Sequence, residues 1–275
     1  MLKQRIITGS LLAIGAVLAF TLLPAYVLVG LLALVTLLAC WEWSDLAGVK
    51  SLALRALYCL LSLGAMALLL ELTQLLGPVP DNTTLRKVFT VAAAWWFVAL
   101  TCVTTYPRSA SAWGAIPARL VIGWLTLLPA WLAFAYLRMQ PFGERKIVFL
   151  LGLVAAADIG AYFSGKAFGK HKLAPAVSPG KSWEGFWGGL VFSLLVATLV
   201  WWFYWAALPL LAWLAVVAFT ALASVLGDLL ESMVKRHRGV KDSGNLLPGH
   251  GGIMDRFDSI SAAAPIFALG LLLVK

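Results

Sequence analysis

Charged side chains and histidines gather between Ser232 and Asp258, in a chain that is otherwise mostly apolar. These twenty-seven residues hold five cations, two histidines and three aspartates. Clustered cations suit a highly anionic ligand, and aspartates can hold a hard divalent metal ion. The segment therefore predicts a site for a phosphorylated ligand, with carboxylates available for a metal.

Two sets of carboxylates have helical spacing. Asp228, Glu231 and Lys235 fall on one stripe of a predicted helix, and Asp255 and Asp258 are three residues apart where the next helix begins. Mg²⁺ is usually held by one or two carboxylates together with substrate phosphates. The pattern predicts a Mg²⁺ site made by these four carboxylates. The alternative is a salt-bridge network, in which the aspartates pair with Lys235 or with the arginine that follows Asp255.

A second polar segment, Ser178-Pro-Gly-Lys-Ser-Trp-Glu-Gly, precedes a long apolar run. It is not a P-loop, because the required glycine is replaced by Pro175 and no strand is predicted before it. We interpret it as a loop that offers N–H groups, a hydroxyl and Lys181 at a helix N-terminus, where phosphate is favoured. The alternative is an ordinary helix cap with a solvated lysine.

Two further residues stand out by their surroundings. Asp158 lies within an apolar span, where an ionisable side chain is a functional candidate by default, and it shares a helical face with Lys166. The alternative for Asp158 is an ion pair that packs two helices. His250, within Gly-His-Gly-Gly, could donate to phosphate or carry a proton near neutral pH.

The segment 232–258 follows the pattern Ser-x-apolar-Lys-Arg-x4-Lys-Asp-x-small-x2-Leu-Pro-x-His-Gly-Gly-apolar-x-Asp-Arg-apolar-Asp. It resembles the signature of the bacterial phosphatidate cytidylyltransferases, or CDP-diacylglycerol synthases, at every defined position. Residues 178–185 also resemble the Ser-Pro-Lys-Lys-Thr/Ser-x-Glu-Gly stretch of that family, but depart from it at Gly180, where a second lysine is common. The resemblance covers 158–258.

The resemblance implies an enzyme of phospholipid biosynthesis that transfers CMP from CTP to phosphatidic acid, giving CDP-diacylglycerol and pyrophosphate. It implies Mg²⁺, with room for a second or monovalent ion. The catalytic candidates are Asp228, Asp255, Asp258, His250 and Lys241. The substrate-binding candidates are Asp158, Lys166, Ser178, Lys181, Glu184, Lys235, Arg236, Asp242 and Arg256.

Composition identifies the elements that must position these residues. The chain is 62% hydrophobic and 12% charged, whereas soluble domains carry about 25% charged residues. Long continuous apolar runs exclude a β-barrel and predict an all-α, polytopic membrane protein embedded in a lipid bilayer. About nine transmembrane helices are predicted, at 5–23, 25–43, 53–76, 86–106, 117–138, 146–168, 184–206, 208–236 and 257–274.

The distribution of Lys and Arg predicts the orientation. With the N-terminus inside, cytoplasmic segments carry 15 of these cations and outer segments carry 6, as the positive-inside rule favours. The basic loops 166–181 and 235–256 then share the cytoplasmic face of a bacterial inner membrane, where we expect the active site. Five helices in 1–145 would precede a catalytic region of four helices in 146–275.

Other classes of protein fit less well. The net charge of +9 is too small and too localised to predict nucleic-acid binding. No internal repeat supports a secondary transporter, whose charges would lie near mid-span. The Asp-Gly-x2-Ala-Arg pattern of CDP-alcohol phosphatidyltransferases is absent. A homodimer is compatible with the sequence.

Overall fold

A computed structural model describes residues 14–205, 208–244 and 251–274 of the chain. Within them, eight helices are long and apolar enough to cross a membrane. They are α2 (Ala25–Leu46), α3 (Leu52–Thr73), α4 (Asn82–Thr104), α6 (Ile116–Met139), α7 (Gly143–Phe168), α8 (Trp183–Val200, continued by the π-helical turn η1, Trp201–Trp205), α9 (Leu210–Arg238) and α10 (Met254–Val274). The polytopic helical class and eight predicted spans are confirmed. The span predicted at 5–23 is helical over 14–22 and otherwise lies outside the described residues, so the number nine stays a prediction.

Two prolines separate consecutive helices. Pro24 is the N-cap of α2, and Pro209 is the N-cap of α9. Proline lacks the N–H that a continuous helix would need, but a helix start leaves that group unpaired in any case. Each proline therefore marks the start of a new span, as the sequence predicts.

The chain also contains short elements that periodicity did not predict. These are α5 (Ala110–Trp113) and an antiparallel hairpin of β1 (Lys172–Ala174) and β2 (Ser178–Ser182). The segment interpreted as a loop is therefore largely a strand, and another strand does precede it. Strands of three and five residues are too short to produce a readable alternation. The P-loop stays excluded, because Pro175 lies in the turn between the strands.

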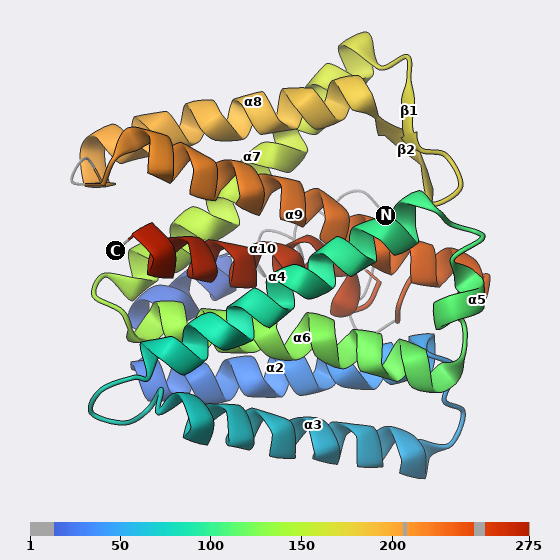
Figure 1. The fold of residues 1–275 in the computed structure, drawn as a ribbon, viewed down its shortest axis with the longest axis horizontal. Coiled ribbons are helices and arrows are strands. Elements are labelled where there is room, and N and C mark those ends of the chain that lie inside the picture. The colour runs from blue at the N-terminus through green and yellow to red at the C-terminus, as the bar shows by residue number, and fades with distance from the viewer. Residues whose placement is uncertain (1–13, 206–207, 245–250, 275) are drawn as a thin grey trace.

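The long helices form one bundle with α6 at its centre (Figure 1). Helix α6 packs against α2 and α10, while α7 pairs with α8 and α9 pairs with α10. The hairpin, α5 and the link between α2 and α3 lie at one end of the bundle, and the C-terminal end of α10 lies at the other (Figure 1). We call the first of these the hairpin end.

Helix α9 ends at Gly239, whose φ of 67° is in the left-handed region that glycine adopts readily. The Gly239 N–H donates to the carbonyl of Arg236, and the Val240 N–H donates to that of Lys235. This cap turns the chain away from the helix and leaves the cations of its last two turns at the hairpin end.

Candidate functional site

The site is built where α9 and α10 touch. A Cβ atom added to Gly227 on α9 would overlap the backbone carbonyl of Asp258 on α10, so only glycine permits this spacing. The two predicted carboxylate pairs are thereby brought together, Asp228 and Glu231 from α9 with Asp255 and Asp258 from α10.

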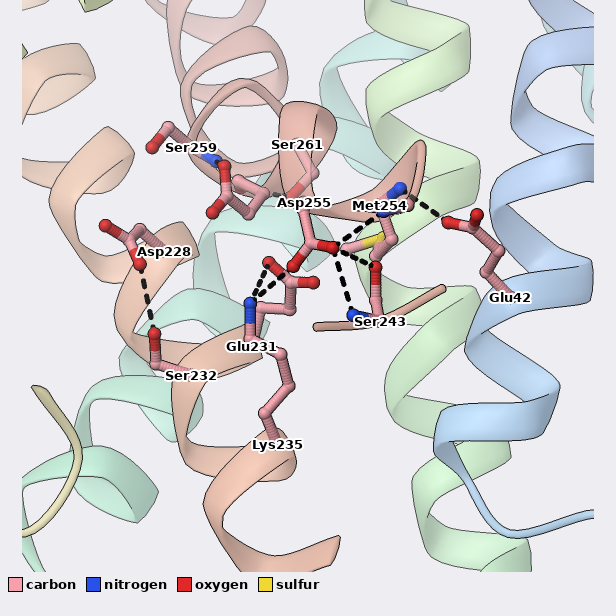
Figure 2. A network of polar contacts seen from close by, with 12 residues as sticks. Glu42, Asp228, Glu231, Ser232, Lys235, Ser243, Met254, Asp255, Ser259 and Ser261 are labelled. Atoms are coloured by element: carbon pink, nitrogen blue, oxygen red, sulfur yellow. Dashed lines mark hydrogen bonds and ion pairs between the residues drawn. The ribbon is translucent and has the colours of Figure 1, made fainter. Parts of the chain in front are cut away.

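Asp255 is held by donors on both of its carboxylate oxygens (Figure 2). Its Oδ1 lies 2.6 Å from the Nζ of Lys235. Its Oδ2 accepts hydrogen bonds from the Ser243 N–H at 3.0 Å, the Ser243 hydroxyl at 2.9 Å and the Gly252 N–H at 2.9 Å. The side chains of Lys235 and Asp255 are 11% and 10% exposed. Asp255 thus ties α9 to both ends of the loop between α9 and α10.

In the described part of the chain, Glu231, unlike Asp255, is not held by backbone or hydroxyl donors. It is 1% exposed, and its carboxylate oxygens accept no hydrogen bond from a backbone or hydroxyl donor among the described residues, although the carboxyl group of Asp258 lies within hydrogen-bonding reach. Its Oε2 lies 3.4 Å from the Nζ of Lys235, which is already engaged by Asp255. Asp258 accepts a bond of 2.6 Å from the N–H of Ser259 and lies close enough to Glu231 for their charges to interact. A buried carboxylate without a hydrogen bond is costly unless a cation compensates it.

Asp228 connects this cluster to the hairpin. Its Oδ2 lies 2.7 Å from the Nζ of Lys181 on β2, and its Oδ1 accepts a bond of 3.1 Å from the hydroxyl of Ser232. The side chains of Lys181 and Asp228 are 27% and 30% exposed. The alternative of a solvated lysine at position 181 is therefore wrong.

A cavity of about 390 Å³ opens beside this pair. It is lined by Asp158 and Lys166 from α7, by Lys181 and by the start of α8. Ser182 caps α8 by accepting a bond from the Gly185 N–H at 3.2 Å. The structure thus brings together the predicted residues of 158–166 and 178–185, which are separated in sequence. Cations and a helix N-terminus around one cavity suit a phosphorylated ligand.

The site as a whole carries an excess of acidic groups. Its five carboxylates are Asp158, Asp228, Glu231, Asp255 and Asp258, and its three lysines are Lys166, Lys181 and Lys235. Oxygen donors with surplus negative charge fit a hard divalent cation. In the described part of the chain, no three acidic, histidine or cysteine side chains are already grouped closely enough to hold a metal ion. Asp255 fits least well, because both of its oxygens are occupied by donors.

An apolar groove of about 910 Å³ adjoins the charged cavity. It runs between α4, α9 and α10 and beneath the turn of the hairpin. Four residues line both spaces, namely Leu173, Phe186, Leu222 and Val225. A cavity that contains charged side chains and adjoins an apolar groove suits a molecule with a charged head and hydrocarbon chains.

Other predicted residues lie around this centre. Arg236 donates through Nε to the carbonyl of Val177 at 3.1 Å and so fastens the hairpin to α9. The Glu184 carboxylate lies 2.7 Å from Nδ1 of His171 and accepts from the His171 N–H, an arrangement that braces β1 against α8. Glu184 therefore supports the hairpin in this structure, and its predicted role in substrate binding stays a prediction.

The remaining candidates are peripheral. Ser178 opens β2, opposite Ala174. Lys241 and Asp242 are exposed in the loop after α9, and Arg256 is exposed on the first turn of α10. His250 lies outside the described residues, so its predicted role stays a prediction.

Sequence reasoning missed Glu42. This residue of α2 is 3% exposed, and its Oε2 accepts a bond of 2.8 Å from the N–H of Met254 at the start of α10 (Figure 2). Its Oε1 is buried, has no hydrogen bond among the described residues and packs close to Gly244, while its Oε2 also lies close to Gly252. The signal was available, because an acidic residue at the edge of an apolar span is a functional candidate for the same reason as Asp158.

Comparison with known proteins agrees with this geometry. The sequence profile of the cytidylyltransferase family matches residues 3–274. The chain is similar to a phosphatidate cytidylyltransferase of Pseudomonas aeruginosa, with 46% identity over 98% of this chain and 96% of the relative. It is also similar to those of Haemophilus influenzae, at 38% identity over 98% of both chains, and of Bacillus subtilis, at 40% over 52% of this chain and 56% of the relative. The chain therefore belongs to the cytidylyltransferase family.

Proposed function

We propose that this multi-pass membrane protein transfers CMP from CTP to phosphatidic acid, giving CDP-diacylglycerol and pyrophosphate. The observation that carries the proposal is the charged cavity of Asp158, Lys166 and Lys181, which joins an acidic cluster on one side and an apolar groove on the other. The two substrates are those of the relatives that match nearly the whole chain.

The chemistry is an in-line displacement. An oxygen of the lipid phosphomonoester attacks the α-phosphorus of CTP, the bond from that phosphorus to the β-phosphate oxygen breaks, and pyrophosphate leaves with the bonding electrons. The attacking phosphate is already an anion near pH 7, so a strong general base is not required. The protein's task is to position both phosphates and to balance their charge.

Residues in different parts of the site would serve different parts of this task. Lys181 and Lys166 line the cavity and are placed to bind phosphate oxygens, and Asp228 orients Lys181 through their ion pair. Lys235 and Asp255 hold the loop after α9 against α10. The apolar groove is suited to acyl chains, so the lipid phosphate would enter the cavity from the groove side.

Mg²⁺ is proposed as the cofactor, held by Asp228, Glu231 and Asp258. The support is the surplus of carboxylates and the burial of Glu231 beside Asp258, where two carboxyl groups share little compensating charge. A bound divalent ion would neutralise phosphate charge in the displacement. Asp255, predicted from spacing as a ligand, is better suited to positioning, because its oxygens already accept four contacts. A monovalent ion and a homodimer stay predictions.

The reaction can be tested directly. Full-length protein purified in detergent should release pyrophosphate only when CTP, phosphatidic acid and Mg²⁺ are all present. Replacing CTP with ATP or phosphatidic acid with phosphatidylcholine provides the controls. Pyrophosphate release without the lipid, or its absence with all three components, would contradict the proposal.

The hairpin end is proposed to face the cytoplasm of the bacterial inner membrane, with the N-terminus inside and the C-terminus outside. Single cysteines at positions 172 and 240 should then be labelled by an impermeant thiol reagent only in inverted vesicles, and one at position 87 only in intact cells. The background must lack Cys40, Cys59 and Cys102. Labelling of position 172 from outside would overturn both this orientation and the location of the site.

We expect Lys241→Ala to weaken the apparent affinity for CTP or phosphatidic acid while leaving the protein folded. Lys241 is exposed in the loop after α9 and has no ion pair or hydrogen bond among the described residues, so its removal should change stability by about 0.5 kcal/mol or less. Steady-state kinetics in both substrates provide the measurement. The exposed Lys87 at the opposite end of the bundle is the matched control, and an unchanged affinity for both substrates would show that Lys241 is only solvated.

A further inference from the structure

A buried arginine that has no ion pair among the described residues lies on the hairpin end, outside the catalytic cavity. Arg119 is the fourth residue of α6 and is 6% exposed. Its Nε is buried without a hydrogen bond, and no carboxylate of the described residues forms an ion pair with its guanidinium. A buried charge of this kind is expensive unless an ion of opposite sign compensates it.

A second arginine lies beside the first. Gly48, in the link between α2 and α3, has a φ of 93°, and a Cβ atom there would lie 3.3 Å from Cζ of Arg238 and 3.5 Å from Nη2 of Arg119. Both guanidinium groups therefore converge on one point of the backbone. Arg238 uses its Nε to donate to the carbonyl of Leu46 at 3.0 Å, and it forms no ion pair in the described part of the chain.

The start of α6 adds to the positive potential. Its N-cap, Ala115, provides no side-chain hydrogen bond, and Pro117 follows in the first turn. The N–H groups of a helix start carry partial positive charge and favour an anion. The nearby acidic side chains are engaged elsewhere, since Asp45 pairs with Arg55 and Glu42 accepts from Met254. The protein thus provides two adjacent cations and a helix N-terminus that no carboxylate of residues 14–205, 208–244 and 251–274 pairs with.

We propose that Arg119, Arg238 and the start of α6 form a second anion site, which binds a phosphate group. Two guanidinium forks and helix N–H groups match the several acceptor oxygens of phosphate. Neither arginine lines the catalytic cavity, so this site does not depend on the proposed reaction. The phosphate can belong to a phospholipid headgroup at the membrane surface or to a soluble phosphate, and the two sources are separable by experiment.

The test uses the full-length protein in an uncharged detergent and measures the midpoint of thermal unfolding. The probes are inorganic phosphate, with chloride at matched ionic strength, and micelles containing phosphatidylglycerol, with phosphatidylcholine as the reference. A bound anion stabilises the native state and raises the midpoint. Arg119→Gln and Arg238→Gln should respond with an apparent affinity weaker by about tenfold or more. Arg108→Gln, which removes an exposed arginine at the same end, should respond as the parent does.

The arms of the experiment identify the ligand. A shift with phosphatidylglycerol alone assigns the site to a lipid headgroup, and a shift with inorganic phosphate assigns it to a soluble phosphate. Without any probe, Arg119→Gln should unfold at the same temperature as the parent or higher, because it removes a buried unpaired charge. Equal responses in all variants would overturn the proposal. So would a clear loss of stability in Arg119→Gln without a probe, because it would reveal a partner within the protein.

Discussion

Asp228→Asn is expected to lower turnover by about a hundredfold or more, because it removes a charge that pairs with Lys181 and that we propose as a ligand for Mg²⁺. The volume of the side chain is retained. The ion pair with Lys181 is partly exposed, so stability should fall by only about 1 kcal/mol or less. Turnover, its dependence on Mg²⁺ concentration and thermal unfolding should be measured on the same preparation.

Asp45→Asn is the matched control for this variant. Asp45 forms an ion pair with Arg55 at 3.2 Å, is 60% exposed and does not line the cavity. This control should retain full turnover. If Asp228→Asn remained active but unfolded at a much lower temperature, Asp228 would be a structural residue and not a ligand for metal or for Lys181 during the reaction.

Asp255→Asn is expected to remove activity and stability together. It leaves Lys235 buried with only Glu231 as a partner and weakens the hydrogen bonds that hold the loop at Ser243 and Gly252. We expect a loss of about 2–4 kcal/mol, somewhat less than for a buried pair with no remaining partner. Chemical unfolding and turnover are the measurements. The Mg²⁺ concentration required for half-maximal residual activity should not rise, in contrast to Asp228→Asn.

A double-mutant cycle separates the ion pair from the other roles of Asp255. Combining Lys235→Met with Asp255→Asn should cost less stability than the sum of the two single substitutions, because each single substitution already breaks the ion pair between these side chains. Activity should stay low, because the loop would still lack its anchor. A stable Asp255→Asn protein with a raised Mg²⁺ requirement would restore the interpretation of Asp255 as a metal ligand.

The long helices could be predicted because each carries a continuous apolar run bounded by charge or proline. Pro24 and Pro209 mark helix starts because proline lacks a backbone N–H, which is a property of the single residue. The hairpin escaped prediction because its strands contain three and five residues, too few for a periodic signal. Its register depends on packing against α8 and α9, which no local pattern reports.

The sequence could predict which residues form the candidate site, but not which of them contact one another. Spacing placed Asp228 and Glu231 on one helical stripe, and the structure confirms that they meet the carboxylates of α10. Spacing could not show that Asp255 is occupied by Lys235 and Ser243, because these contacts arise from the turn after α9. For Glu42, its position at the edge of an apolar span could have marked the residue, but its partner, the N–H of Met254, is more than two hundred positions away, so the contact itself could not be predicted.

The hydrogen bond that the Met254 N–H donates to Glu42 also affects how hybrids between this chain and its relatives could be made. It joins the first described long helix to the start of the last, so the two halves of the sequence share one structural unit at the site. A hybrid that took residues 1–145 from one relative and 146–275 from another would have to preserve both partners and the glycines that face Glu42. Exchange points chosen only from loop positions do not take this link into account, and they keep it only where the first half retains Glu42 and the second half retains the small residues that face it. In a hybrid protein, residues 1–145 and 146–275 should therefore come from the same relative, although the recognisable signature lies entirely in 146–275.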